Sequence, residues 1–141
     1  VSIYVDQQPL PYSPMARGAI LDLERVEVLK GPQGTLFGQN STGGAVNYIA
    51  AKPTRDLSAG FDVTYGRFNQ LEAEAFVSGP VSDTLGFRLA VRSDNRGNWQ
   101  KGYTIDQELG KTRFLNGRLS LDFEPSDSVR LLLTASGWRD K

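Results

Sequence analysis

The sequence contains no cysteine and no histidine, and these two absences exclude most familiar catalytic and metal-binding sites. Without cysteine the chain cannot form a disulfide, a thiolate metal site or a thiol nucleophile. Without histidine it lacks the usual general base and the commonest metal ligand. Carboxylate catalysis, for example by Glu72 and Glu74, is the enzymatic alternative that stays open. We expect a protein that is not an enzyme and holds no metal or cofactor.

The sequence also lacks net charge and long apolar runs. Lysine plus arginine and aspartate plus glutamate number 16 each, so no excess of positive charge indicates nucleic acid. No apolar run reaches the roughly 18 residues of a transmembrane helix. The first residues do not have the basic and apolar pattern of a signal segment, and the chain begins with Val1 rather than Met. These features fit a cytoplasmic protein or a piece of a longer precursor, and we favour the piece.

The most specific stretch runs from Glu24 to Ala51 and combines two short strands with a glycine-rich loop. Alternation predicts strands over 24–29 and 45–50. Glycine permits positive φ angles and close backbone approach, so the loop is expected to be tightly folded. It matches no dinucleotide fingerprint and lacks the lysine of a phosphate-binding loop. The simplest interpretation is that its glycines fix the loop geometry: Gly31, Gly34, Gly38, Gly43 and Gly44.

The residues before this stretch predict a small, mostly irregular segment. Ser2 to Asp6 alternates like a short strand, and turn residues follow through Pro9. Three prolines, Pro9, Pro11 and Pro14, are expected to prevent regular structure as far as Ser13. Residues 20–23 could form one helical turn or an extended entry into the next strand, and we favour a short helix. The strand over 24–30 carries charge on both faces, which indicates polar surroundings.

From residue 57 onward the hydrophobic period becomes two and stays so. Five runs have one apolar and one mostly polar face: 60–65, 70–77, 85–94, 118–124 and 129–136. Short turns at 66–69, 79–83 and 124–127 and a long polar loop at 97–111 connect them. The pattern predicts an antiparallel meander and a mainly β protein.

Two architectures use this alternation. A soluble sandwich or barrel buries the apolar face, whereas an outer-membrane barrel turns it toward lipid. The alternation of short and longer connections favours the membrane, as do aromatic residues near the ends of the runs. Five strands are too few to close, because the smallest outer-membrane barrels use eight. The aromatic residues are Tyr65, Phe68, Trp99, Tyr103, Phe123 and Trp138.

The segment from Leu23 to Gly38, followed by Gly43 to Asn47, resembles the plug-domain signature of TonB-dependent outer-membrane receptors. Ser2 to Pro9 resembles the strand and turn before that signature, although Gln7 stands where glycine is common. Lys52-Pro53 resembles the exit from the plug. The resemblance implies a small α+β plug segment (1–55, the C-terminal part of the plug domain) and about five antiparallel up-and-down strands of a transmembrane β-barrel (56–141).

The resemblance also implies a function. Such receptors reside in the outer membrane of Gram-negative bacteria and import a scarce ligand, such as a ferric siderophore, haem, cobalamin or an oligosaccharide. The plug gates the barrel lumen, and the TonB energy-coupling complex acts through an N-terminal box that this sequence lacks. The implied partners are that complex, the small ligand and outer-membrane lipid, but no nucleic acid. A passive porin or a secreted β-rich adhesin is the alternative, although it leaves the glycine segment unexplained.

Site residues follow from the resemblance as hypotheses. Gln39 and Asn40 resemble the plug apex that meets ligand, and Tyr12 and Arg17 are weaker candidates; a purely structural role is the alternative for all four. The charged plug residues Arg25, Glu27 and Lys30 would face Glu72, Glu74, Arg88 and Arg92 of the barrel wall, unless they are merely solvated. The full motif comprises Glu24, Arg25, Glu27, Lys30, Gly31, Pro32, Gly34, Gly38, Gly43 and Gly44.

Overall fold

The protein consists of two compact units, Val1–Lys52 and Pro53–Lys141. The computed structural model describes residues 2–12, 15–31, 43–102, 108–126 and 128–141. The chain divides after Lys52, whereas the sequence suggested a boundary after Arg55. Thr54 belongs to the second unit, because its backbone N–H donates to the Ser78 hydroxyl at 2.9 Å.

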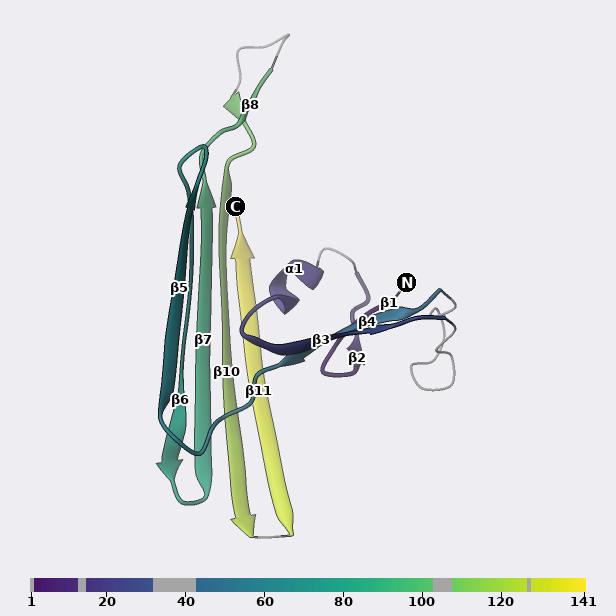
Figure 1. Cartoon of the computed structure of the whole chain (residues 1–141), viewed down its shortest axis with the longest axis vertical. Coiled ribbons are helices and arrows are strands. Elements are labelled where there is room, and N and C mark those ends of the chain that lie inside the picture. Colours follow the sequence, from purple (N-terminus) through teal and green to yellow (C-terminus); the bar gives the residue numbers. More distant parts are fainter. Residues whose placement is uncertain (1, 13–14, 32–42, 103–107, 127) are drawn as a thin grey trace. The chain divides into compact units, whose positions relative to one another are not determined.

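The described part of the first unit is built on a four-stranded sheet in the order β2-β1-β4-β3 (Figure 1). Strands β1 and β4 are parallel, and the β1/β2 and β3/β4 pairs are antiparallel. Tyr4 and Leu21 are almost fully buried and form its core with Ala45 and Ile49. The strand bounds are β1 Ser2–Val5, β2 Gln8–Pro9, β3 Leu23–Leu29 and β4 Ala45–Ala50.

The helix expected over 20–23 is wrong, because the helical turn α1 lies earlier, at Ala16–Ala19. Ile20 has a ψ of 75°, Asp22 has a φ of 48°, and Leu23 already opens β3. Burial of Leu21 in the core favours this extended entry over a further helical turn. Pro9 also departs from expectation, since it lies in the edge strand β2, where a missing N–H is tolerated. No helix in the described ranges is long and apolar enough to cross a membrane.

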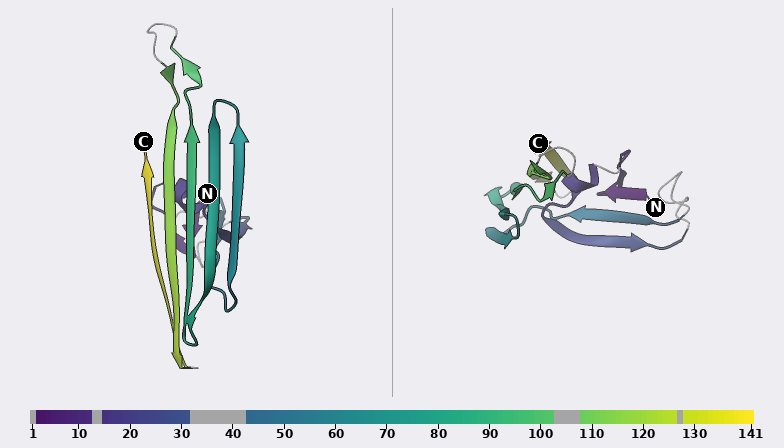
Figure 2. Two further views of the ribbon diagram at one scale, coloured as in Figure 1. Left: turned by 90° about the vertical axis from the view of Figure 1, so that its left-hand side faces the viewer. Right: turned by 90° about the horizontal axis from the view of Figure 1, so that it is seen from above.

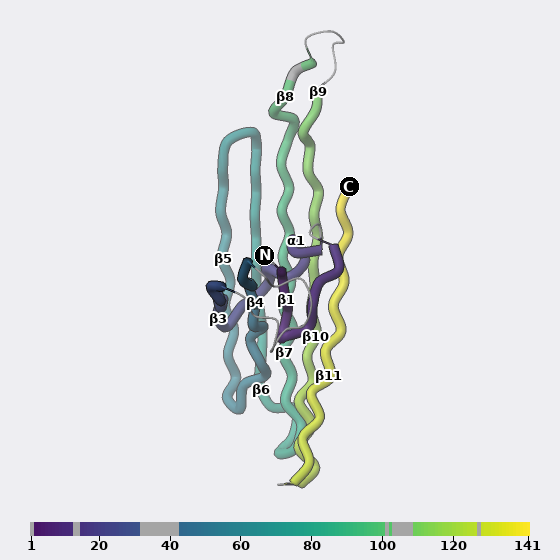
Figure 3. The backbone as a smooth tube through the Cα atoms, turned by 90° about the vertical axis from the view of Figure 1, so that its right-hand side faces the viewer, coloured from purple at the N-terminus to yellow at the C-terminus, as the bar shows by residue number. Residues whose placement is uncertain are grey.

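The second unit confirms the predicted antiparallel meander. Its described residues include a five-stranded sheet in the order β11-β10-β7-β6-β5, whose strands stand next to one another in the left view of Figure 2. The backbone reverses at each connection along this sheet (Figure 3). The long polar connection expected at 97–111 contains the short strand pair β8 Gln100–Lys101 and β9 Glu108–Leu109. The long strands are β5 Ser58–Gly66, β6 Gln70–Ser82, β7 Leu85–Arg96, β10 Thr112–Ser126 and β11 Val129–Asp140.

The two faces of this sheet have the reverse of the usual polarity. Odd-numbered residues form the apolar face and are widely exposed: Phe61 is 86% accessible and Leu133 is 64% accessible. Even-numbered residues form the polar face, where Arg118 and Asp122 are each only 8% accessible. One aromatic expectation changes: Trp138 pairs with Asn116 and so lies on the polar face.

Candidate functional site

The motif residues of the first unit are positioned by the antiparallel pair β3/β4. Glu27 lies opposite Asn47, and Arg25 lies opposite Ile49. The register shifts between Leu23 and Arg25, so Glu24 has no partner in the regular ladder. Such a bulge reorients side chains locally, and it allows Arg25 to contact acidic side chains on both sides of itself in the sequence.

These residues form a chain of polar contacts that crosses the sheet. The Arg25 guanidinium donates to Glu27 Oε1 through Nε at 2.8 Å and to Glu24 Oε1 through Nη1 at 2.5 Å. The second carboxylate oxygen of Glu27 accepts from Asn47 Nδ2 at 3.1 Å. Asn47 is fully buried, and its Oδ1 accepts from the backbone N–H of Gln7 at 3.1 Å. The network therefore links β3, β4 and the β1–β2 turn.

The network shifts the ionisation of its charged members. The pKa of Glu27 is lowered, first by the hydrogen bond from Arg25 and then by that from Asn47. The pKa of the Arg25 guanidinium is raised, first by its hydrogen bond to Glu27. These contacts therefore favour the charged form of both groups. The Arg25 side chain is 52% accessible, so its ion pairs are solvated. Solvated ion pairs contribute little to the free energy of unfolding.

The β1–β2 turn is fixed to the sheet by backbone contacts as well. Asp6 and Gln7 both have positive φ angles, 48° and 69°, which is typical of a type I′ two-residue turn. The Asp6 carboxylate accepts from the Ala50 backbone N–H at 3.0 Å, and the backbone N–H of Asp6 donates to the Tyr48 carbonyl at 3.0 Å. Asp6 and Asn47 thus both contribute contacts that anchor the turn to β4.

Two glycines flank the loop between β3 and β4. Gly44 has a φ of +109°, and a Cβ there would lie 2.5 Å from the Leu29 carbonyl oxygen. Gly31 has a φ of +80° in open space. The structure thus supports the geometric role that the sequence assigned to these two. Pro32, Gly34, Gly38, Gln39 and Asn40 lie outside the described residues.

The remaining predicted residues of the first unit are dispersed along it. Tyr12 is 70% accessible, and Arg17 lies in α1. Lys30 follows β3 and Gly43 precedes Gly44 at the other end of the loop. Nothing described places Tyr12 or Arg17 in a site together, so their assignment stays a prediction.

The predicted wall residues share the polar face of the second unit. Arg92 forms ion pairs with Glu72 and with Glu74, the latter at 3.8 Å. Arg88 lies over the Phe76 ring, 4.1 Å from its centroid. The structure therefore brings Glu72, Glu74 and Arg92 together within the sheet, while Arg25 and Glu27 pair with each other in the first unit.

A second polar cluster on this face was missed from the sequence. Arg130 donates to Asp122 through Nε at 2.9 Å and through Nη2 at 2.5 Å, and it also contacts Glu124 at 3.0 Å. Asn47 and Asp6 were missed as well. Their only sequence signal was position: Asn47 is a polar residue within an otherwise apolar strand. No group of three or more metal-ligating side chains occurs in the described ranges.

Comparison with known proteins gives this arrangement a context. Residues 1–45 match the family model of the TonB-dependent receptor plug domain. The chain is 30% identical over 129 residues to the pesticin receptor of Yersinia pestis, covering 90% of this chain and 19% of that protein. It is 32% identical over 105 residues to the ferripyoverdine receptor of Pseudomonas aeruginosa, covering 72% of this chain and 12% of that one.

Solved structures show the same fold. The ferric yersiniabactin uptake receptor of Yersinia pestis superposes with a TM-score of 0.79 at 27% identity, over 97% of this chain and 22% of that one. The pyoverdine outer membrane receptor of Pseudomonas aeruginosa gives a TM-score of 0.82 at 21% identity, over 99% of this chain and 20% of that one. The chain thus spans about a fifth of the length of the Yersinia relatives that it matches.

Proposed function

Because the chain belongs to the TonB-dependent receptor family of the Gram-negative outer membrane, we propose that it is part of a longer receptor that imports a ferric siderophore. In this proposal residues 1–52 belong to the plug that gates the lumen. Residues 53–141 supply membrane-spanning strands whose polar face lines that lumen. The part of the receptor that meets the TonB energy-coupling complex lies outside this sequence.

The inverted polarity of the second sheet is the observation that carries the proposal. A water-soluble sheet buries its apolar face, whereas here large apolar side chains such as Phe61 and Leu133 are exposed. The apolar face of β10 runs from Leu115 to Phe123, which is nine residues. A tilted strand needs about 9–11 residues to cross the hydrocarbon layer. Lipid is the solvent in which such a face is stable.

The first unit supports a gating role. The ion pair between Arg25 and Glu27 is solvated, so it can be exchanged for other contacts without a large desolvation cost. Positive φ angles at Gly31 and Gly44 mark both ends of the loop between β3 and β4. Contacts between the plug charges and wall charges such as Glu72 and Arg92 remain part of the proposal.

The proposed substrate class is a ferric siderophore rather than a sugar or cobalamin. The similar proteins are named as receptors for pesticin, for ferripyoverdine and for ferric yersiniabactin. Gln39 and Asn40 are the proposed ligand contacts of the plug, with Tyr12 and Arg17 as secondary ones. Binding and gated import need no catalytic group, so we propose no enzymatic activity.

The test is uptake of radioactive ferric siderophore by cells that carry the full-length receptor. We expect deletion of the receptor gene, or loss of energy coupling, to abolish uptake under iron starvation. Uptake that persists without energy coupling would instead identify a passive pore. Within the receptor, Gln39→Ala is expected to weaken siderophore binding, whereas Gln8→Ala, on the exposed edge strand β2, leaves it unchanged. Equal binding by both variants would remove Gln39 from the site.

A further inference from the structure

The chain enters the second sheet through residues 53–57, which we call the exit segment. The chain divides into its two units after Lys52, so the exit segment is the first part of the second unit. It has no regular secondary structure and leads into β5 at Ser58. Its contacts to β6 and β7 therefore determine where the chain that leaves the first unit is attached to the sheet.

The hydroxyl of Ser78 in β6 is the centre of these contacts. Ser78 is fully buried, at 0% accessibility. Its Oγ accepts from the backbone N–H of Thr54 at 2.9 Å and donates to the Phe87 carbonyl of β7 at 2.9 Å. The Thr54 hydroxyl lies 2.9 Å from the same oxygen and 2.8 Å from the Asp56 carbonyl, so its single proton serves one of the two. One buried side chain thus joins the exit segment, β6 and β7.

Two glycines let the exit segment come close to the sheet beside this hydroxyl. A Cβ on Gly79 would lie 3.3 Å from Leu57 Cα, and one on Gly86 would lie 3.4 Å from Pro53 Cβ. Glycine permits such close approach because it has no side chain. Gly79 follows Ser78 directly in β6, and Gly86 lies in the neighbouring strand β7. The sheet therefore accommodates the exit segment in shape as well as by hydrogen bonds.

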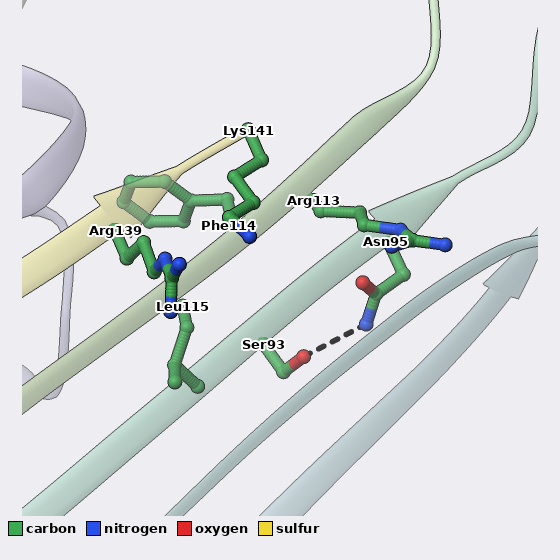
Figure 4. A pocket seen from close by; sticks show the side chains of 7 residues that line it. All are labelled: Ser93, Asn95, Arg113, Phe114, Leu115, Arg139 and Lys141. Carbon is green, nitrogen blue, oxygen red and sulfur yellow. Dashed lines mark hydrogen bonds between the residues drawn. The ribbon is translucent and has the colours of Figure 1, made fainter.

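Other serine hydroxyls of the sheet make more local contacts. Figure 4 shows Ser93 accepting from Asn95 Nδ2, two residues further along the same strand, at 2.9 Å. Ser82 is exposed at the end of β6, and its hydroxyl lies 3.4 Å from that of Thr84. Ser78 instead contacts residues 24 and 9 positions away. Because a buried donor that loses its partner costs more than an exposed one, the contact at Ser78 is the strongest attachment of the three.

We propose that Ser78 anchors the exit segment to β6 and β7, and that this anchor stays closed while the first unit rearranges to admit ligand. The proposal rests on the gating role proposed above for the first unit. The Thr54 N–H would lose its buried partner if the exit segment left β6. The Arg25–Glu27 ion pair of the first unit is solvated, so its exchange costs less. Rearrangement is then confined to the first unit, and the exit segment is the fixed point from which that unit returns.

The first experiment measures hydrogen exchange at the Thr54 amide in the purified full-length receptor. Ser78→Ala removes the hydroxyl, and Ser82→Ala is the matched control, because it makes the same change at an exposed position of the same strand. We expect exchange at Thr54 to be at least about fivefold faster in Ser78→Ala, as for a buried donor left without its partner. Ser82→Ala should exchange at the wild-type rate.

Equal exchange at Thr54 in Ser78→Ala and in the wild type would overturn the anchor. If Ser78→Ala does not fold, Gly86→Val replaces it, because the added side chain would displace Pro53. The same acceleration is expected in that variant, and an unchanged rate would overturn the anchor there too.

The second experiment follows thiol labelling in cells that import a ferric siderophore. This chain has no cysteine, so Ala45→Cys and Thr54→Cys each place a single thiol in it. Ala45 is 1% accessible in the first unit, and Thr54→Cys keeps the N–H that donates to Ser78. We expect energy coupling to speed the labelling of Ala45→Cys several-fold and to leave that of Thr54→Cys unchanged. In Thr54→Cys/Ser78→Ala, energy coupling should speed the labelling as well.

Labelling of Thr54→Cys that rises as much as that of Ala45→Cys would overturn the proposal. A disulfide gives a second check, because the Thr54 and Ser78 hydroxyl oxygens lie 2.9 Å apart and sulfur atoms in their places can bond. Thr54→Cys/Ser78→Cys should import siderophore at the same rate oxidised and reduced, with the oxidant-treated wild type as control. Import that is lost on oxidation and restored by reduction would also overturn the proposal. If Ala45→Cys labelling does not respond to energy coupling, the gating role fails, and the exchange at Thr54 decides the anchor alone.

Discussion

Leu132 and Leu133 are neighbours on β11 whose side chains occupy opposite faces of the sheet. Leu132 pairs with Asp122 on the polar face, and Leu133 pairs with Leu121 on the apolar face. Both are exposed, at 45% and 64% accessibility. If both faces met water, arginine would be tolerated at either position, with changes within about 0.5 kcal/mol. If the apolar face meets lipid, the two substitutions differ sharply.

The expected difference follows from the depth of Leu133. Its row lies next to the middle of the apolar face, which extends from Leu131 on one side to Leu115 on the other. An arginine on the lipid face costs about 2–4 kcal/mol at the bilayer midplane and less toward the interface. We therefore expect Leu133→Arg to destabilise the folded receptor by about 2 kcal/mol, or about thirtyfold in the folding equilibrium. Leu132→Arg places its charge opposite Asp122 and should be nearly neutral.

The assay is urea unfolding of the full-length receptor in lipid vesicles, together with the amount recovered in the outer-membrane fraction. Both variants carry the same substitution on the same strand, so general effects of arginine cancel in the comparison. Equal tolerance of Leu132→Arg and Leu133→Arg would refute the lipid-facing assignment. Equal damage by both would show that strand position, rather than face, controls the outcome.

Three further predictions concern the first unit. Gly44→Ala should destabilise this unit by more than about 1 kcal/mol, because the added Cβ would lie 2.5 Å from the Leu29 carbonyl oxygen at a positive φ. We expect faster limited proteolysis of the plug in this variant, and proteolysis at the wild-type rate would contradict the prediction. Because the pKa of Glu27 is lowered by Arg25, the stabilisation by its carboxylate is present above the ordinary carboxyl pKa and is lost as the pH falls through the lowered one. The gap in unfolding midpoint between the wild type and Glu27→Gln should therefore shrink between about pH 7 and pH 3, and a constant gap would argue against the ion pair. Gln7→Gly should raise stability by up to about 1 kcal/mol, since glycine relieves a φ of 69°; a lowered unfolding midpoint would contradict the turn assignment.

Periodicity carried much of the fold prediction. The alternation from residue 57 onward predicted the five long strands and their meander order, because a period of two assigns both strand and face. The strand over 45–50 was also located correctly, since its apolar residues stand between glycines and Lys52-Pro53. Strand ends were less well predicted: β10 begins at Thr112, six residues before the run that began at Arg118.

Local signals failed where tertiary contacts decide the backbone. Residues 20–23 have the composition of a helical turn, yet burial of Leu21 and the entry into β3 make them extended. Asn47 stood out only as a polar residue in an apolar strand, and its role was not predictable because its partners, Glu27 and the Gln7 N–H, lie 20 and 40 positions away. Register likewise brings Arg113 beside Asn95 and Leu115 beside Arg139, which lie 18 and 24 positions apart in the sequence.

The sequence by itself determined the strand type, the meander, the glycine-bordered loop and the family, because these depend on local periodicity and on a contiguous motif. Only the tertiary structure decided which charges form ion pairs. Arg25 pairs with Glu24 and Glu27, and Arg130 pairs with Asp122. Periodicity specifies which side of a strand a residue occupies, whereas register and bulges specify which residues become neighbours across strands.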